Sequence, residues 1–166
     1  MNIDKTQLVS YLEVDINSQQ LILVESEKTI AKYIVSTAKN GAGEFSGSEC
    51  TPRGRHIIRA KIGLNCPENT VFVARRATGE IYQPSLRKQF PERDWILTRI
   101  MWLSGCERGK NRLYNSDTMR RYIYIHGCPD EDIMGIPSSH GCIKMRNSEL
   151  IELFDRVKVY TPVLIK

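Results

Sequence analysis

The sequence predicts a mainly β protein that folds as a single domain over residues 1–166. Three observations support this prediction. Apolar and polar residues alternate with a period of two through much of the first half, as they do in strands with one buried face. Only one segment, near the carboxyl terminus, has the apolar spacing of an amphipathic helix. A chain of 166 residues also fits one domain and can bury enough surface to fold without disulfides.

The first three predicted strands form an antiparallel meander. Leu12, Val14 and Ile16 alternate with acidic residues, which gives a strand with one apolar face. A polar turn over residues 17–20 leads to a second strand at 21–24, and another turn leads to a third strand at 29–37. Connections this short join neighbouring antiparallel strands.

The middle of the chain contains long loops between further strands. Residues 39–53 hold three glycines and read as a loop that closes on the Thr-Pro-Arg-Gly turn at 51–54. Strands follow at 56–62 and 71–74. Residues 78–94 are polar and irregular and predict an excursion over the surface, after which 95–103 form an apolar strand and 104–119 a polar loop.

The strand predicted at 121–126 has polar aromatic and histidine side chains on one of its faces. Ile123 and Ile125 point to the core if the alternation holds. Tyr122, Tyr124 and His126 then share the opposite face.

The predicted helix covers residues 147–157 and is followed by a closing strand at 159–165. Asn147 is the expected N-cap, and Glu149 lies in the first turn. Pro162 predicts that the closing strand lies at a sheet edge. The apolar stripe of the helix is formed by Leu150, Leu153, Phe154 and Val157.

Composition argues against nucleic-acid binding. The formal net charge is +5 and the pI is about 9.0, but no run of five like charges occurs. Basic residues spread in this way indicate a solvated surface rather than a nucleic-acid interface. A mildly basic rim would still attract a peptide rich in carboxylates.

The location is predicted to be cytoplasmic. The first residues show no basic segment followed by an apolar one, and no stretch of about 18 apolar residues could span a membrane. The odd count of five cysteines fits free thiols in a reducing compartment. A truncated sequence that had lost its signal would look similar, and the protein would then be periplasmic.

A candidate catalytic pair lies at Cys142 and His126, 16 residues apart in sequence. Backbone amides at the turn that contains Cys142 would stabilise an oxyanion and favour the thiolate. A loop with Pro and Gly residues allows His126 to reach the thiol, deprotonate it and later protonate a leaving amine. The carbonyl of Gly127 is the expected partner that fixes the imidazole tautomer.

Each of these residues also has a purely structural interpretation. A lone cysteine in a β protein is usually a small buried apolar residue. The tripeptide His-Gly-Cys occurs twice, so His126, Cys128, His140 and Cys142 could supply four zinc ligands. Their spacing is atypical of zinc loops, and we expect no metal and no cofactor.

The residues around the pair match a known family. The segment 139–143 reads Ser-His-Gly-Cys-Ile, preceded at this distance by His-Gly at 126–127, and it resembles the signature of the L,D-transpeptidase (YkuD) catalytic domain. The likeness extends from Tyr11 to the carboxyl terminus. In the first half it is carried by Val14-Asp15, by Leu21 to Leu23, by Val35 to Thr37 and by the turn at 51–54.

The resemblance implies a β-sandwich with a mixed sheet and a pocket at the cysteine. It implies that Cys142 is the nucleophile and His126 the proton donor and acceptor. Where relatives often carry Arg or Asn, this chain has Lys144, and Arg146 follows two residues later. The remaining candidates for the oxyanion hole and substrate binding are Ser139, His140, Gly141, Tyr124, Lys144 and Arg146.

The resemblance also implies the reaction. Family members attack the amide between the L-centre of diaminopimelate and the terminal D-Ala of a stem tetrapeptide, through a thioester. Water as acceptor gives an L,D-carboxypeptidase, and an amine gives a 3→3 cross-link or an exchanged D-amino acid. We expect the carboxypeptidase, acting on soluble muropeptides in murein recycling. A catalytically dead or zinc-stabilised wall-peptide binder is the alternative from another class.

Overall fold

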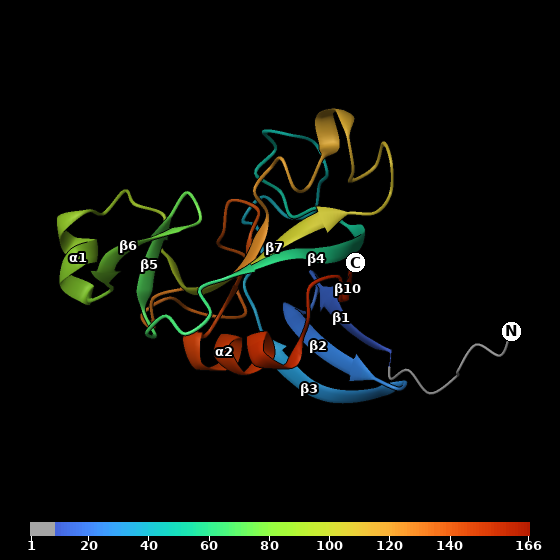
Figure 1. The fold of residues 1–166 in the computed structure, drawn as a ribbon. Coiled ribbons are helices and arrows are strands. Elements are labelled where there is room, and N and C mark those ends of the chain that lie inside the picture. The colour runs from blue at the N-terminus through green and yellow to red at the C-terminus, as the bar shows by residue number, and fades with distance from the viewer. Residues whose placement is uncertain (1–8) are drawn as a thin grey trace, which may run out of the picture.

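The computed structural model describes residues 9–166, and these form one mixed sheet of ten strands with two short helices (Figure 1). This confirms the predicted mainly β fold. Residues 1–8, on which part of the prediction about an export signal rests, lie outside the described residues. The elements in chain order are β1 (Ser10–Asp15), β2 (Gln20–Glu25), β3 (Lys28–Ile34), β4 (Gly54–Ile62), β5 (Thr70–Val73), β6 (Arg76–Ile81), α1 (Pro84–Gln89), β7 (Ile96–Gly105), the 3-10 turn η1 (Tyr114–Ser116), β8 (Tyr124–Gly127), β9 (Ile143–Met145), α2 (Asn147–Arg156) and β10 (Pro162–Ile165).

The strand order is β3-β2-β1-β10-β4-β7-β5-β6, with β8 paired to β7 and β9 paired to β8. β1–β10 and β8–β9 are parallel pairs and the others are antiparallel, so the predicted meander of β1, β2 and β3 is confirmed. The predicted edge position of the closing strand is wrong, because β10 lies between β1 and β4. Pro162 is its first residue, where a missing N–H is tolerated.

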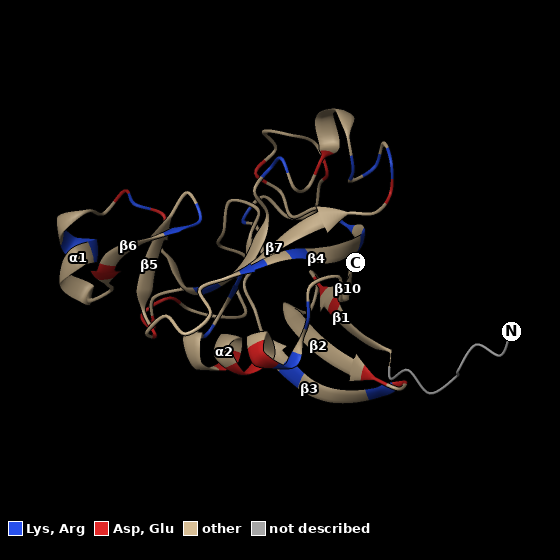
Figure 2. Cartoon of the chain, viewed as in Figure 1, with Lys and Arg blue, Asp and Glu red and all other residues tan. Residues whose placement is uncertain are grey.

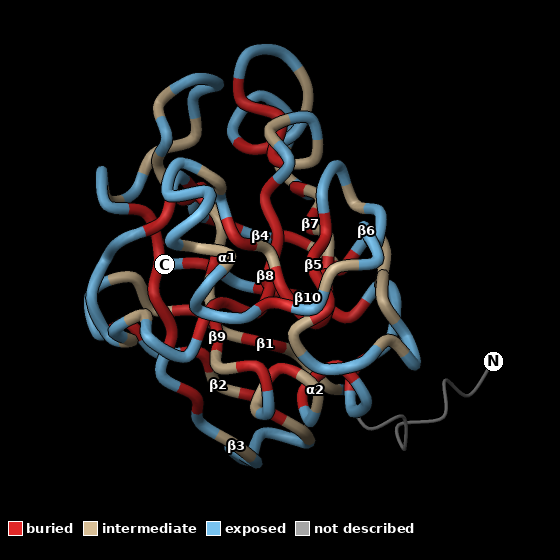
Figure 3. The backbone as a smooth tube through the Cα atoms, turned by 90° about the vertical axis from the view of Figure 1, so that its left-hand side faces the viewer, coloured by how far each residue is buried: buried red, intermediate tan, exposed pale blue. Residues whose placement is uncertain are grey.

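The main core lies between the sheet and α2. Leu12, Val14 and Leu21 from the meander pack in one buried cluster with Leu150 and Phe154 of the helix. The helix ends at Arg156, one residue before its predicted end. Figure 3 shows the buried backbone running through the central strands, with exposed segments at the periphery.

The region 78–94 is more regular than predicted. It contains the end of β6 and the helix α1, which stand apart from the meander in Figure 1. Leu86 of α1 packs against a small cluster that includes Tyr82 and Trp95, whose rings meet edge to face at 5.0 Å. Six residues with one apolar contact are too short to show a helical period, which is why the sequence did not reveal α1.

Strand β8 starts later than predicted, at Tyr124, because Tyr122 has a left-handed backbone with φ of 56°. The predicted alternation is nevertheless confirmed. Ile123 and Ile125 are buried in the main core, and Tyr124 packs in a separate cluster that includes Cys142. Lys, Arg, Asp and Glu are scattered over all parts of the fold (Figure 2). Within residues 9–166 no helix has the length and apolar character needed to cross a membrane.

Candidate active site

A pocket of about 480 Å³ lies beside β8 and collects most of the predicted site residues. Its wall includes Tyr124, His126, Ser139, His140 and Cys142. These side chains come from β8 and from the segment that leads into β9. The structure therefore brings together residues that are up to 18 positions apart in the sequence.

The parallel pairing of β8 and β9 places His126 and Cys142 on one face. Ile125 is paired with Ile143 and His126 with Lys144, so Cys142, just before β9, lies beside Tyr124. Side chains two residues apart on a strand share a face. Cys142 and His126 are consequently diagonal neighbours on adjacent strands, and both line the pocket.

The imidazole of His126 is buried and held in one orientation. Its Nδ1 lies 2.7 Å from the carbonyl oxygen of Gly127, which is the contact expected from the sequence. Because a carbonyl only accepts, Nδ1 carries the hydrogen and Nε2 keeps its lone pair. The basic nitrogen is then the one available to the pocket.

Burial keeps both groups of the pair uncharged. It lowers the pKa of His126, against the opposing effects of Asp94 and of the Gly127 carbonyl. Burial also raises the pKa of Cys142 to about 12, although the N–H of Tyr124 acts in the opposite direction. The expectation that the turn favours the thiolate is therefore not met, since at neutral pH the pair is a thiol beside a neutral imidazole.

The sulfur of Cys142 is positioned by the backbone at and just before the start of β8. The N–H of Tyr124 donates to Sγ at 3.3 Å, and the thiol donates to the carbonyl of Tyr122 at 3.4 Å. Ser139 Oγ donates to the Cys142 carbonyl at 2.5 Å and accepts from the N–H of Gly141 at 3.2 Å. The turn that presents the thiol is thus closed by a serine side chain.

Glycine is required at position 141. Its φ is 131°, which residues with side chains rarely adopt, and an added Cβ would lie 2.9 Å from Ile123 Cδ1. Its carbonyl accepts a hydrogen bond from Thr51 Oγ1 at 2.9 Å. The loop over residues 39–53 therefore supports the cysteine turn from behind.

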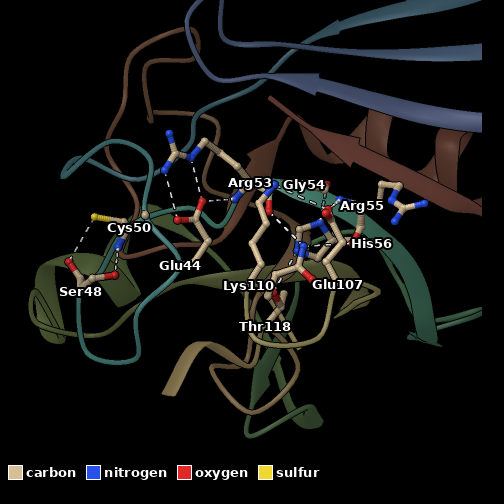
Figure 4. Close-up of polar contacts among 12 residues, drawn as sticks. Glu44, Ser48, Cys50, Arg53, Gly54, Arg55, His56, Glu107, Lys110 and Thr118 are labelled. Atoms are coloured by element: carbon tan, nitrogen blue, oxygen red, sulfur yellow. Dashed lines mark hydrogen bonds and ion pairs between the residues drawn. The ribbon is translucent and has the colours of Figure 1, made fainter. Parts of the chain in front are cut away.

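That loop is itself fixed by charged side chains (Figure 4). Arg53 forms an ion pair with Glu44 at 2.8 Å, and just past the loop, at the start of β4, the N–H of Arg55 donates to Glu107 at 2.7 Å. Arg121 donates to four groups of the loop, including the Cys50 carbonyl at 2.5 Å. The guanidinium of Arg121 is therefore engaged in hydrogen bonds to the loop.

Asn147 has a different role from the predicted cap. Arg146 occupies the N-cap position without a capping side chain, and Asn147 is buried at the first helical position. Its Nδ2 donates to the Cys128 carbonyl at 2.9 Å, and its Oδ1 accepts from Thr98 Oγ1 at 2.7 Å. A Cβ on Gly127 would collide with Oδ1 at 2.1 Å. Asn147 therefore packs directly against the segment that orients the imidazole of His126.

Two basic candidates lie outside the pocket wall. Lys144 forms an ion pair with Asp132 at 3.1 Å, and Asp132 also binds Arg87 at 2.7 Å. Arg146 donates to the Asp130 carbonyl at 2.8 Å. Both side chains are engaged with the 129–132 loop.

The four residues of the alternative zinc interpretation do not form a metal-binding group among the described residues. Cys128 is buried, and its thiol donates to the Met145 carbonyl at 3.4 Å. Over residues 9–166, no cluster of three or more His, Cys, Asp or Glu side chains has a geometry that could hold a metal ion.

The sequence did not single out two charged residues that line the pocket, Arg75 and Asp94. Arg75 lies in the turn between β5 and β6, and Asp94 precedes β7. Neither belongs to a recognisable motif. Their approach to Cys142 depends on pairing between distant strands.

Comparisons with known proteins match this chain to one family. A model of the L,D-transpeptidase catalytic domain, YkuD, matches residues 9–165. YqjB of Bacillus subtilis (strain 168), whose name assigns it to the L,D-transpeptidases, is 25% identical over 156 residues, which cover 93% of this chain and 70% of YqjB.

Solved structures share the fold at lower identity. The L,D-transpeptidase from Xylanimonas cellulosilytica DSM 15894 is 18% identical with a TM-score of 0.55, covering 100% of this chain and 64% of that one. L,D-transpeptidase 3 from Mycobacterium tuberculosis, in complex with a faropenem-derived adduct, is 12% identical with a TM-score of 0.58, covering 96% of this chain and 60% of that one. This chain thus spans less than two-thirds of both solved chains. Because the family model matches nearly all the described residues, the chain belongs to the L,D-transpeptidase (YkuD) catalytic domain family.

Proposed function

We propose that this enzyme hydrolyses the L–D amide of peptidoglycan stem tetrapeptides and releases the terminal D-Ala. One observation carries the proposal. Cys142 and His126 line the same pocket from paired strands, with Nδ1 of the imidazole fixed on the Gly127 carbonyl. This arrangement provides a nucleophile and a base with an assigned basic nitrogen.

In the first half of the reaction, Nε2 of His126 takes the thiol proton as Sγ of Cys142 attacks the amide carbon. The neutral resting pair makes this transfer part of the attack itself. The backbone N–H of Cys142 is our candidate donor to the oxyanion, because the N–H of Gly141 is already bound to Ser139. The C–N bond then breaks, the imidazolium protonates the leaving amine of D-Ala, and a thioester remains.

In the second half, water attacks the thioester. His126 removes a proton from the water, the C–S bond breaks, and the proton returns to the sulfur. The products are a tripeptide carboxylate and the free thiol. Overall, one water molecule is consumed for each amide C–N bond that is cut.

Transpeptidation is the second candidate function, and one observation favours it. A second pocket of about 250 Å³ shares Arg121, Ile123 and His140 with the pocket of Cys142. An amine acceptor bound there could reach the thioester in place of water. The product would then be a cross-linked or exchanged peptide.

We propose a cytoplasmic location and a role in murein recycling. All five cysteines are free thiols in the described chain, which supports a reducing compartment. Soluble muropeptides are the substrates that such a compartment would offer.

The test is mass spectrometry of a tetrapeptide incubated with the enzyme, with and without an added D-amino acid. Tripeptide and D-Ala should dominate without the acceptor, and exchange should be minor with it. If exchanged or dimeric products appear and no free tripeptide does, the enzyme is a transpeptidase and not a carboxypeptidase. Faropenem provides an independent readout, because a mass increase on the Cys142 peptide reports the nucleophile even without turnover.

A matched pair of variants tests the nucleophile. Cys142→Ala should abolish turnover and the faropenem adduct. Cys128→Ser should retain most activity, because that thiol is buried and bound to the Met145 carbonyl. Activity of Cys142→Ala within about tenfold of the parent would contradict the proposed nucleophile. A parent enzyme with neither product nor adduct would indicate a peptide-binding protein.

A further inference from the structure

The β5–β6 turn places one arginine at the pocket in a strained backbone. Ala74 and Arg75 connect the two strands and both have positive φ, 47° and 64°. Turns of this kind normally use Gly, Asn or Asp. Residues with side chains persist in such conformations when surrounding contacts hold them, and they are concentrated at functional sites.

Three aromatic residues hold the guanidinium of Arg75. It lies 4.7 Å from the ring centre of Trp102 and 4.8 Å from that of Tyr122. Its Nη1 donates to the hydroxyl of Tyr124 at 3.0 Å. A planar guanidinium held against aromatic rings still has free N–H groups and is preorganised to bind a carboxylate.

No acidic side chain within residues 9–166 forms an ion pair with Arg75. The other cation in the pocket wall, Arg121, is engaged by backbone carbonyls of the 39–53 loop. Arg75 is therefore the cation that remains available to a ligand next to Cys142.

Asp94 provides the opposite charge in the same pocket. It is exposed, it lines the pocket with Cys142 and His126, and its negative charge raises the pKa of both. Within the described part of the chain its carboxylate has neither a hydrogen-bond nor an ion-pair partner, whereas Glu80 nearby in sequence is bound to Arg93. Arg75 and Asp94 do not pair with each other, which leaves a positive and a negative group separately presented to the pocket.

We propose that Arg75 and Asp94 form a subsite that binds a free α-amino acid group, in which one carbon carries a carboxylate and an ammonium. Arg75 binds the carboxylate and Asp94 accepts from the ammonium. The side chain of diaminopimelate ends in this group, so the subsite would select the third residue of the stem peptide. The inference rests on the proposed function, and it adds which third residue of the stem peptide the enzyme prefers.

A panel of three tetrapeptides separates the two charges. Their third residue is diaminopimelate, diaminopimelate with an amidated side-chain carboxyl group, or lysine. Arg75→Gln should lower kcat/KM for the diaminopimelate peptide by about 10- to 100-fold, mainly through KM, and should change the other two by less than about threefold, because only the first offers the carboxylate. Asp94→Asn should lower kcat/KM for all three peptides, because each carries the ammonium.

Neighbouring residues provide the controls. Arg76→Gln and Glu92→Gln remove the same charges from exposed side chains outside the pocket wall, and both should behave as the parent. Arg75→Lys keeps the charge but loses the planar stacked group, so it should recover only part of the discrimination. Thermal melting of each variant checks that the hairpin remains folded.

The outcomes distinguish the subsite from the proposed reaction. If Arg75→Gln lowers kcat/KM equally for all three peptides, Arg75 only supports the pocket and the subsite is refuted. If the parent cuts none of them, the proposed function fails, and calorimetry with Cys142→Ala protein then tests the subsite alone. In that case the diaminopimelate peptide should bind about 10-fold or more tightly than the amidated peptide, and this preference should disappear when Arg75→Gln is added. Equal binding would refute the subsite.

Discussion

Replacing Asn147 should destabilise the whole fold, even though the residue was predicted only to cap a helix. In Asn147→Ala the Cys128 carbonyl loses its donor and the Thr98 hydroxyl loses its acceptor, and Cys128 and Thr98 are fully buried. A buried polar group without a partner costs about 1–3 kcal/mol, so the two together should lower the free energy of unfolding by about 3–4 kcal/mol. For a chain of this size that corresponds to a melting temperature lower by about 10 °C.

Urea unfolding of three variants measures this effect. Asn17→Ala is the control, because Asn17 is exposed and donates only through its backbone, and it should change stability by less than about 0.5 kcal/mol. Asn147→Asp keeps the acceptor for Thr98 but turns a carboxylate oxygen toward the Cys128 carbonyl. It should be at least as destabilised as Asn147→Ala at neutral pH. A loss below about 1 kcal/mol in Asn147→Ala would refute the reasoning, since the buried carbonyl would then have another partner.

Two further predictions concern pH. Because burial raises the pKa of Cys142 to about 12, its alkylation by iodoacetamide in the free enzyme should keep rising with pH beyond pH 9, followed on the Cys142 peptide by mass spectrometry. A plateau near pH 7 would instead indicate a thiolate–imidazolium pair. Burial also lowers the pKa of His56 from 6.5 to about 4, so the unfolded chain binds a proton more readily than the folded one between these values. The resulting stability is fully present above pH 6.5, and about 3 kcal/mol of it should be lost as the pH falls toward 4. His56→Gln should flatten this dependence in urea unfolding, and an unchanged slope would exclude His56 as its source.

Local patterns predicted the parts of the site that lie within one strand or turn. The alternation around Ile123 and Ile125 put Tyr124 and His126 on the pocket face, and the glycine before Cys142 marked a turn that only glycine tolerates. The partner of the His126 Nδ1 atom was predictable because it is the next residue.

Long-range pairing decided what the sequence could not predict. Pro162 indicates an edge strand in isolation, but its strand is inserted between two others. Lys144 follows the cysteine by two residues, yet its side chain forms an ion pair with Asp132 and does not line the pocket. Arg75 lines the same pocket as Cys142 because β5 and β8 both pair with β7, a relation that no local pattern encodes.

The central position of β10 has a consequence for how the protein is made. β1 and β4 emerge from the ribosome early, but β10, the strand that lies between them, ends at Ile165. Until β10 has been synthesised, β1 and β4 each have one unpaired edge. Exposed edges of this kind are where chains associate wrongly. The sheet can be completed only after residue 165 has been synthesised and has left the exit tunnel, so until then the β1 edge of the meander is open to pairing with other chains.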